Sequence, residues 1–369
     1  MALIELEIIL IAIVVASACA IPGVFLILRK MALMSDAISH AILLGIVLAF
    51  FVIKDIQSPI LILGASIAGI LTVALTELVI KTNRIKEDAA IGFIFPIFFS
   101  IGVILISKFA GDVHLDTDAV LLGEMAFAPF ERFYIHDIDL GPKSLWVMGT
   151  ILLLNLTFIG LFYKELKIAT FDKALSKSLG FSPLLLHYGL MFLVSITAVG
   201  AFDAVGSILV VALMITPPAT AYLLTESLSK MIGLSVFIGM ISAVTGYGLA
   251  GLLDASIAGS MATMTGVIFL LAFIFSPNRG VYVQLVRQRQ QKLTFASHML
   301  TVQLFDHEGQ KEEAWENTVS NMIYHMGWSP KFAKQVTAVA IQNKLITRQK
   351  DHLTLTPLGR ETAKTAMTL

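Results

Sequence analysis

The sequence predicts an all-α polytopic membrane protein with a small C-terminal winged-helix α+β domain, and three observations lead to this fold class. Of the 369 residues, 57% are hydrophobic and only 14% are charged, whereas soluble domains carry about 25% charged residues. Apolar runs of about 17–25 residues, the length that crosses a bilayer, recur as far as Pro277. Beyond Pro277 these runs stop, and the composition becomes that of a soluble domain.

The apolar runs predict about eight or nine transmembrane helices within a membrane domain of residues 1–280. Two runs are less regular than the rest, because one is short and another contains two adjacent prolines. Counting both, the predicted spans are 7–28, 37–53, 59–80, 89–107, 144–163, 183–201, 204–223, 231–251 and 257–276. The side of the N-terminus depends on whether 7–53 holds one span or two.

Basic residues next to the spans predict the orientation of the chain. Lys and Arg gather on the cytoplasmic side of membrane proteins, and here they fall in alternate loops. The basic groups are Arg29 and Lys30; Lys81, Arg84 and Lys86; Lys164, Lys167, Lys173 and Lys177; and Arg279, Arg287, Arg289 and Lys292. We therefore expect the 164–182 loop and the C-terminal tail in the cytoplasm, and the long 108–143 loop outside.

The tail, residues 281–369, is predicted to be a separate domain. Ser329-Pro330 supplies an N-cap and a first-turn proline for a helix over about 330–344. The chain from Leu345 to Thr356 alternates around Lys350-Asp351, as a small hairpin does. Thr356-Pro357 then begins a last helix. Two helices, a hairpin and a final helix are typical of a winged helix.

The composition also excludes several classes of function. The 26 Lys and Arg residues balance the 26 Asp and Glu residues, so a broadly basic surface for nucleic acid is excluded as the main feature. The single cysteine, Cys19, excludes a disulfide framework and a cysteine-cluster zinc site. The sequence also lacks GxxxxGK[ST], HExxH and GxSxG. We therefore expect no ATP binding through a P-loop, and the simplest intramembrane hydrolase mechanisms are excluded, so no enzymatic activity is expected of this chain.

Asp36 and His40 form the most informative polar pair in the spans. Residues four apart on a helix lie on one face, about 5–6 Å from each other, and a carboxylate and an imidazole at that spacing can share one divalent ion. Ser35 and Ser39 repeat the spacing beside them and are candidates to hold water. On spacing alone, a simple Asp–His hydrogen bond near a span end remains the alternative.

Two ligands from one chain make a loose site, and a loose site suits a transport pathway because the ion must also leave. Two copies of the chain around a two-fold axis would offer two Asp and two His, a set that suits manganese, iron(II) or zinc. Other ionisable residues in the spans have simpler readings. Glu77 is expected to pair with Lys81 at i+4, and Asp203 is expected at the outer mouth, in solvent or in a vestibule.

The prolines Pro217 and Pro218 fall at membrane depth within the run that begins at Gly206-Ser207 and passes Thr216. Adjacent prolines leave backbone carbonyls without helical partners, and irregular backbone is tolerated in a membrane only inside protein or along a cavity. We expect a broken helix that lines the pathway through Gly206, Ser207, Thr216, Pro217 and Pro218. A simple kink is the alternative.

With these motifs together, residues 8–277 resemble the permease subunits of bacterial ABC importers for manganese, zinc and iron. The matching segments are Leu28 to Ala41, Phe171 to Gly180, and Val205 to Leu209 with Thr216 to Ala221. The resemblance implies a permease dimer of the cobalamin-importer type, with Asp36 and His40 contacting the metal. It also implies that the segment with Phe171, Asp172 and Gly180 docks on the ATPase.

The sequence departs from this family at several places, among them Ser176 and Ser178, where the family often has Ala. Asp203 and the Pro217-Pro218 pair stand where the family commonly has other residues, and typical members stop near the equivalent of Arg279. The tail resembles the winged-helix domains of iron-dependent repressors, through Leu345 to Thr347 and Leu353 to Arg360.

The predicted function is that of a permease in an ATP-driven importer of manganese, zinc or iron, in the bacterial inner membrane. The ion is cargo, and no cofactor is expected to stay bound. Expected partners are an ABC ATPase, an extracytoplasmic metal-binding protein, a second permease copy and membrane lipid. The alternative is a membrane-tethered, metal-responsive regulator whose tail, residues 281–369, binds DNA. A proton-coupled carrier is disfavoured, since a chain of buried carboxylates is lacking.

Overall fold

The computed structural model describes residues 2–54, 58, 60–82, 84–109, 125–135, 138–310, 315 and 317–368. The chain forms two compact units, Met1–Ser276 and Pro277–Leu369. The change from apolar to polar composition at Pro277 therefore coincides with the limit between the units. The sequence-based boundary at 280/281 lies four residues further along the chain.

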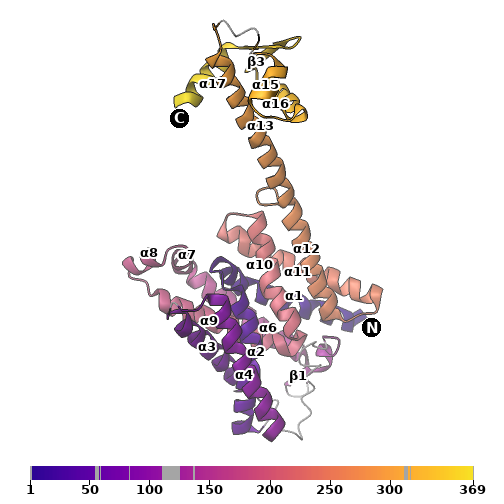
Figure 1. Cartoon of the computed structure of the whole chain (residues 1–369). Coiled ribbons are helices and arrows are strands. Elements are labelled where there is room, and N and C mark those ends of the chain that lie inside the picture. Colours follow the sequence, from indigo (N-terminus) through magenta and orange to yellow (C-terminus); the bar gives the residue numbers. More distant parts are fainter. Residues whose placement is uncertain are drawn as a thin grey trace. The chain divides into compact units, whose positions relative to one another are not determined.

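The first unit is a helical bundle, and nine of its described helices are long and apolar enough to span a membrane (Figure 1). Each predicted span corresponds to one of them, including the two irregular runs, so the first 53 residues hold two helices. The nine are α1 Ala2–Leu28, α2 Ala32–Ile53, α3 Ile60–Ile80, α4 Glu87–Phe109, α6 Lys143–Leu161, α9 Pro183–Val205, α10 Ser207–Leu224, α11 Leu228–Leu253 and α12 Ile257–Phe275.

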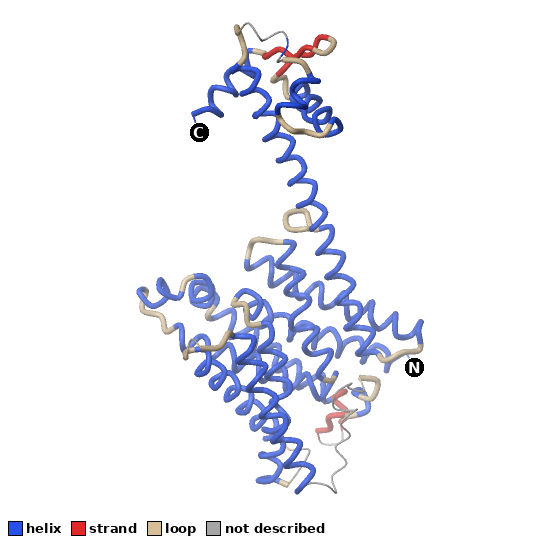
Figure 2. The backbone as a smooth tube through the Cα atoms, viewed as in Figure 1, coloured by secondary structure: helices blue, strands red, loops and turns tan. Residues whose placement is uncertain are grey.

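Shorter elements connect these helices (Figure 2). A 3-10 turn, η1 (Ala128–Phe130), and a hairpin of β1 (Arg132–Ile135) and β2 (Ile138–Pro142) precede α6. The guanidinium of Arg132 lies 3.0 Å from the Glu7 carboxylate of α1 and 2.6 Å from Asp139. This contact holds the hairpin to the bundle, and Arg132 lowers the pKa of Asp139. Two further short helices, α7 (Tyr163–Phe171) and α8 (Lys173–Ser178), precede α9.

Helix α1 lies at the centre of the bundle, packed against α6, α9, α10 and α11. Its middle is almost entirely buried. The amide of Asn155 on α6 donates to the Ala18 carbonyl at 3.1 Å and to the Thr197 hydroxyl at 2.9 Å, so one buried polar side chain joins three helices. Interhelical hydrogen bonds of this kind stabilise packing where the surroundings are apolar.

The prediction of a helix break at Pro217 and Pro218 is wrong, because α10 continues through both prolines. Pro218 has no N–H for the Met214 carbonyl, and Gly23 of α1 packs so closely against that carbonyl that a Cβ at Gly23 would overlap with it. Tight packing therefore covers the freed backbone. The interruption lies instead at Gly206, whose φ of 79° separates α9 from α10.

The second unit contains α13 (Val281–Asp306), α15 (Val319–His325), α16 (Pro330–Gln342), β3 (Ile346–Gln349), β4 (His352–Leu355) and α17 (Pro357–Thr368). These elements follow the predicted order of helices, hairpin and final helix. Ser329 accepts the Phe332 N–H at 3.3 Å, and Thr356 accepts the Gly359 N–H at 3.0 Å, so both predicted N-caps are confirmed. Long α13 was not predicted.

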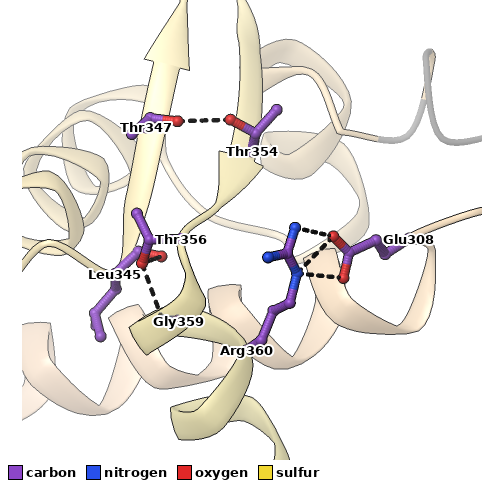
Figure 3. Close-up of polar contacts among 7 residues, drawn as sticks. All are labelled: Glu308, Leu345, Thr347, Thr354, Thr356, Gly359 and Arg360. Carbon is purple, nitrogen blue, oxygen red and sulfur yellow. Dashed lines mark hydrogen bonds and ion pairs between the residues drawn. The ribbon is translucent and has the colours of Figure 1, made fainter.

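Two contacts shown in Figure 3 close this second unit. The Thr356 hydroxyl lies 3.0 Å from the Leu345 carbonyl, which joins the start of α17 to the start of the hairpin. The Arg360 guanidinium reaches both carboxylate oxygens of Glu308 at 2.7–3.0 Å, which joins α17 to the end of α13. The small apolar core of the second unit is formed by side chains of α13, α15, α16 and both strands.

Candidate functional site

Asp36 and His40 lie on one face of α2, one turn apart. His40 Nε2 is 3.4 Å from Asp36 Oδ1, and the two side chains are 30% and 41% exposed, respectively. Both side chains are therefore accessible, although most of their helix neighbours are buried. The predicted juxtaposition of a carboxylate and an imidazole is present in the structure. At this distance the two side chains can form a hydrogen bond with each other, or move apart slightly and coordinate one ion together.

Two aromatic rings of α4 surround the imidazole of His40. The Phe95 ring stacks on it with centroids 5.4 Å apart, and the Phe99 ring meets it edge-on at 5.9 Å. The rings limit the orientations of the imidazole and exclude water from one side. The sequence analysis missed both residues. Their i,i+4 spacing in an apolar span was the available signal, but it does not reveal which helix they face.

The two serines beside the pair each donate a hydrogen bond to another part of the protein. Ser39 donates its hydroxyl to the Ser35 carbonyl at 3.0 Å, and Ser35 donates to the Met214 sulfur at 3.1 Å. Both serines are buried, and their role as holders of water stays a prediction. The Ser35–Met214 contact places α10 directly beside α2, two residues before Thr216. Gly206 and Ser207 lie at the other end of α10.

Within the described part of the chain, no group of three or more His, Cys, Asp or Glu side chains gathers to hold a metal. Asp36 and His40 thus supply two ligands of the oxygen and nitrogen types that manganese, iron(II) and zinc accept. Water, backbone or another chain would have to complete the coordination. An arrangement of this kind favours reversible contact with an ion over tight storage.

A second candidate surface lies on α7, α8 and the turn that follows. Phe171, Leu175 and Leu179 are 64%, 47% and 54% exposed and follow one another at intervals of four residues. Asp172 caps α8 by accepting the Leu175 N–H at 2.9 Å. We call these three apolar residues the apolar stripe. The sequence analysis named Phe171 and Asp172 and missed Leu175 and Leu179.

Gly180 ends α8 with a defined backbone turn. The Gly180 N–H donates to the Lys177 carbonyl and the Phe181 N–H donates to the Ser176 carbonyl, both at 3.1 Å. This pair of bonds is a Schellman motif, which needs a left-handed residue. Gly180 has a φ of 84° and provides it. The glycine therefore fixes the direction in which the chain leaves the apolar stripe and enters α9.

The interpretation of Glu77 as an ion-pair partner of Lys81 is wrong. Its carboxylate lies 2.6 Å from His187 Nε2 and accepts the Tyr188 hydroxyl at 2.9 Å. The partners come from α9, more than a hundred residues further along the chain. Local i,i+4 spacing does not reveal a contact of this kind, so the sequence pattern pointed to the wrong neighbour.

With this geometry described, the chain can be compared with known proteins. The model of the ABC 3 transport family matches residues 4–276, which are nearly all of the helical bundle. The chain belongs to the ABC 3 transport family. Membership implies an ABC ATPase and a substrate-binding protein as partners, and the ATPase is a separate chain in this family.

Relatives of this ABC 3 protein are metal-transport membrane proteins. It is 47% identical over 354 residues to the zinc transport system membrane protein TroD of Treponema pallidum, covering 96% of each chain. It is 46% identical over 275 residues to the manganese transport system membrane protein MntD of Bacillus subtilis, covering 74% of this chain and 93% of MntD. The ABC 3 protein is thus a multi-pass transport subunit.

A solved structure supports the ABC permease fold. A chain of PsaBC from Streptococcus pneumoniae, solved in complex with Fab, superimposes with a TM-score of 0.61 and 32% sequence identity. The match covers 74% of this ABC 3 chain and 92% of that chain. The TroD match is too long to fit in the bundle alone and must include most of the tail. The tail's likeness to iron-dependent repressors stays a prediction.

Proposed function

We propose that this chain is the permease of an ATP-driven importer of manganese, zinc or iron, and that the ion passes Asp36 and His40 as substrate. The observation that carries the proposal is the accessible Asp36–His40 pair on α2, in a chain whose relatives bear the names of zinc and manganese transport proteins. No resident cofactor is needed, because the ion itself is the cargo.

The positions of the basic residues support a bacterial inner-membrane topology with the tail in the cytoplasm. If the nine described apolar helices each cross the bilayer once, all four basic groups fall on one side. The positive-inside rule makes that side the cytoplasm. The N-terminus then lies outside, and the apolar stripe and the second unit lie inside. Asp36 is close to the cytoplasmic end of α2.

The apolar stripe is the surface that best fits the ATPase. Phe171, Leu175 and Leu179 present apolar side chains to solvent, flanked by capped helix ends at Asp172 and Gly180. Exposed apolar groups that are held in fixed positions are typical of protein interfaces. The extracytoplasmic metal-binding protein would meet the opposite side, and a second permease copy would bring a second Asp36–His40 pair to the pathway.

Helix α10 is the proposed second wall of the pathway. Met214 contacts Ser35, the neighbour of Asp36, and the proline pair follows directly after Thr216. The unbroken part of α10 around Pro217 and Pro218 would then face the pathway. Gly206 and Ser207 would lie at the outer end of α10. The irregular backbone at Gly206 supplies the interruption that the sequence analysis placed at the prolines.

Transport by the purified complex tests the proposal. The permease, its ATPase and its metal-binding protein are reconstituted in liposomes, and uptake of radioactive manganese, zinc and iron is measured with ATP and with a non-hydrolysable analogue. We expect uptake of at least one of these metals with ATP only. Equal uptake with the analogue, or none with any of the three metals, would contradict it.

The regulator alternative finds no support in the described hairpin of the tail. Arg348 donates to the Lys350 carbonyl at 2.7 Å and lies 3.8 Å from the Asp351 carboxylate. The Asp351 carboxylate therefore offsets part of the positive charge that the hairpin tip could offer to phosphates. A contact or regulatory role inside the importer fits the tail better.

Removal of the tail should leave a working permease. A cut after Gln291 would divide α13, so the truncation is made after Gly280, which lies beyond the first unit and before α13. The MntD match covers 93% of MntD with only 275 residues of this chain, about the length of the first unit. We therefore predict ATP-dependent uptake within about threefold of the full chain, with altered regulation or complex stability. Failure of the truncated chain to reach the membrane would show that the tail belongs to the folding core.

A further inference from the structure

A polar cluster joins four segments of the bundle apart from the Asp36–His40 pair. Arg29 follows α1, Glu77 lies near the end of α3, and Thr170 is on α7. His187 and Tyr188 lie in the second turn of α9. His187 Nε2 lies 2.6 Å from Glu77, and His187 Nδ1 lies 3.1 Å from Arg29 Nη1. Arg29 Nε donates to the Thr170 hydroxyl at 3.2 Å.

The hydrogen-bonding groups of the cluster determine which ring nitrogen of His187 carries the proton. A guanidinium has only donors, so the Nδ1 atom that Arg29 contacts is an acceptor. The proton of the neutral imidazole then sits on Nε2, which faces the Glu77 carboxylate. His187 thus connects the positive charge of Arg29 to the negative charge of Glu77. Burial lowers the pKa of Arg29 to about 10, so the guanidinium stays charged at neutral pH.

The backbone at Arg29 forms a tight corner between α1 and the helix that bears Asp36. The Lys30 N–H donates to the Ile27 carbonyl at 3.1 Å, and the Met31 N–H donates to the Leu26 carbonyl at 2.9 Å. Helix α2 begins at once, at Ala32, and Asp36 is about 6 Å further along its axis. A displacement of Arg29 would therefore move the end of α2 that carries the proposed metal ligand Asp36.

On its other side, the same guanidinium contacts the segment proposed to meet the ATPase. Thr170 directly precedes Phe171, the first residue of the apolar stripe, and both belong to α7. A single hydrogen bond, from Arg29 to Thr170, joins α7 to the corner that precedes α2. In the described residues, the cluster thus bridges the proposed docking surface and the proposed metal pair.

One donor of this cluster has no partner within the described part of the chain. The second terminal nitrogen of Arg29, Nη2, is buried and has no hydrogen-bond partner among the described residues. A buried donor without a partner is costly, and an apolar corner would avoid that cost. A second arrangement, in which a shifted α7 offers Nη2 an acceptor, gives the spare donor a use.

We propose that Arg29 is a positioning residue that passes movements of α7 and α8 to the metal-binding end of α2, with His187 and Glu77 holding its charge in place. The inference rests on the proposed function, because it takes the apolar stripe as the ATPase contact and Asp36 as a metal ligand. Movement of α7 pulls Arg29 through Thr170, and the tight corner transmits the pull to Asp36.

The test measures metal transported and ATP hydrolysed by the same reconstituted complex. The variants are Arg29→Gln, Thr170→Val and the double variant, and Thr157→Val is the matched control, because its hydroxyl bonds only within its own helix. We expect each single variant to keep at least about half of the ATPase rate and to lose about tenfold in metal per ATP. The double variant should lose no more than the worse single variant, since both changes break one contact.

The outcomes separate this inference from the proposed function. A parallel loss of ATPase and uptake, additive losses in the double variant, or a transport ratio within about twofold of wild type would overturn the coupling role of Arg29. Arg29→Lys, which keeps the charge, should restore part of the ratio, and failure to do so would also contradict the proposal. Absence of ATP-dependent metal uptake by the wild-type complex would instead overturn the proposed function.

Discussion

Metal uptake should fall at least about hundredfold when Asp36 is replaced by alanine, and the same loss is expected for His40→Ala. Each change removes one of the two ligands that α2 offers, and no third His, Cys, Asp or Glu stands close enough among the described residues to replace it. Both side chains are partly exposed on a helix surface, so truncation opens no large cavity in the core. Uptake by cells and by liposomes measures the effect.

A matched aspartate separates loss of the ligand from loss of the fold. Asp88 is exposed at the start of α4, so Asp88→Ala should leave uptake within about twofold of wild type. The amount of Asp36→Ala protein in the membrane should also match wild type. Normal uptake by either the Asp36 or the His40 variant would remove that residue from the pathway. Weak equilibrium binding of metal would not contradict the role, because transport needs only transient contact.

The membrane domain could be predicted from the sequence because its signal is local. An apolar run of sufficient length has to form a helix in lipid, where every backbone group needs a partner within the segment. The helix break that was wrongly predicted at Pro217 and Pro218 shows the limit of local signals. Their lost hydrogen bond was foreseen, but the close packing of Gly23 that lets α10 continue depends on a helix nearly two hundred residues earlier.

The candidate site was predictable only as far as its partners were near in sequence. Asp36 and His40 lie on one face of one helix, so their spacing identified them as a pair. Asp172 and Gly180, which act on their own short helix, were named through the resemblance to the permease family. The rings of Phe95 and Phe99 and the contact of Glu77 with His187 join different helices. Such contacts depend on how the helices pack, which one sequence does not specify.

Replacement of Gly180 by valine should uncouple ATP hydrolysis from transport or prevent the ATPase from co-purifying. At a φ of 84° the position is left-handed, and a side chain there costs roughly 1–2 kcal/mol, more when it is β-branched. The least strained response is to abandon the Schellman motif, which would turn the apolar stripe away from its present direction. A cost of that size corresponds to a loss of about 5- to 30-fold in affinity for the ATPase.

The expected effect of Gly180→Val comes from the left-handed backbone at this position and not from a lack of room for the side chain. Gly160 provides a control that separates these two causes. A Cβ added at Gly180 meets no atom within 4 Å, and the same holds for Gly160, which lies in helical conformation on α6. Gly160→Val should therefore leave co-purification and uptake unchanged, although it adds the same side chain. If Gly180→Val also assembles and transports normally, the direction of the chain after α8 does not matter for coupling, and another cytoplasmic loop must bind the ATPase.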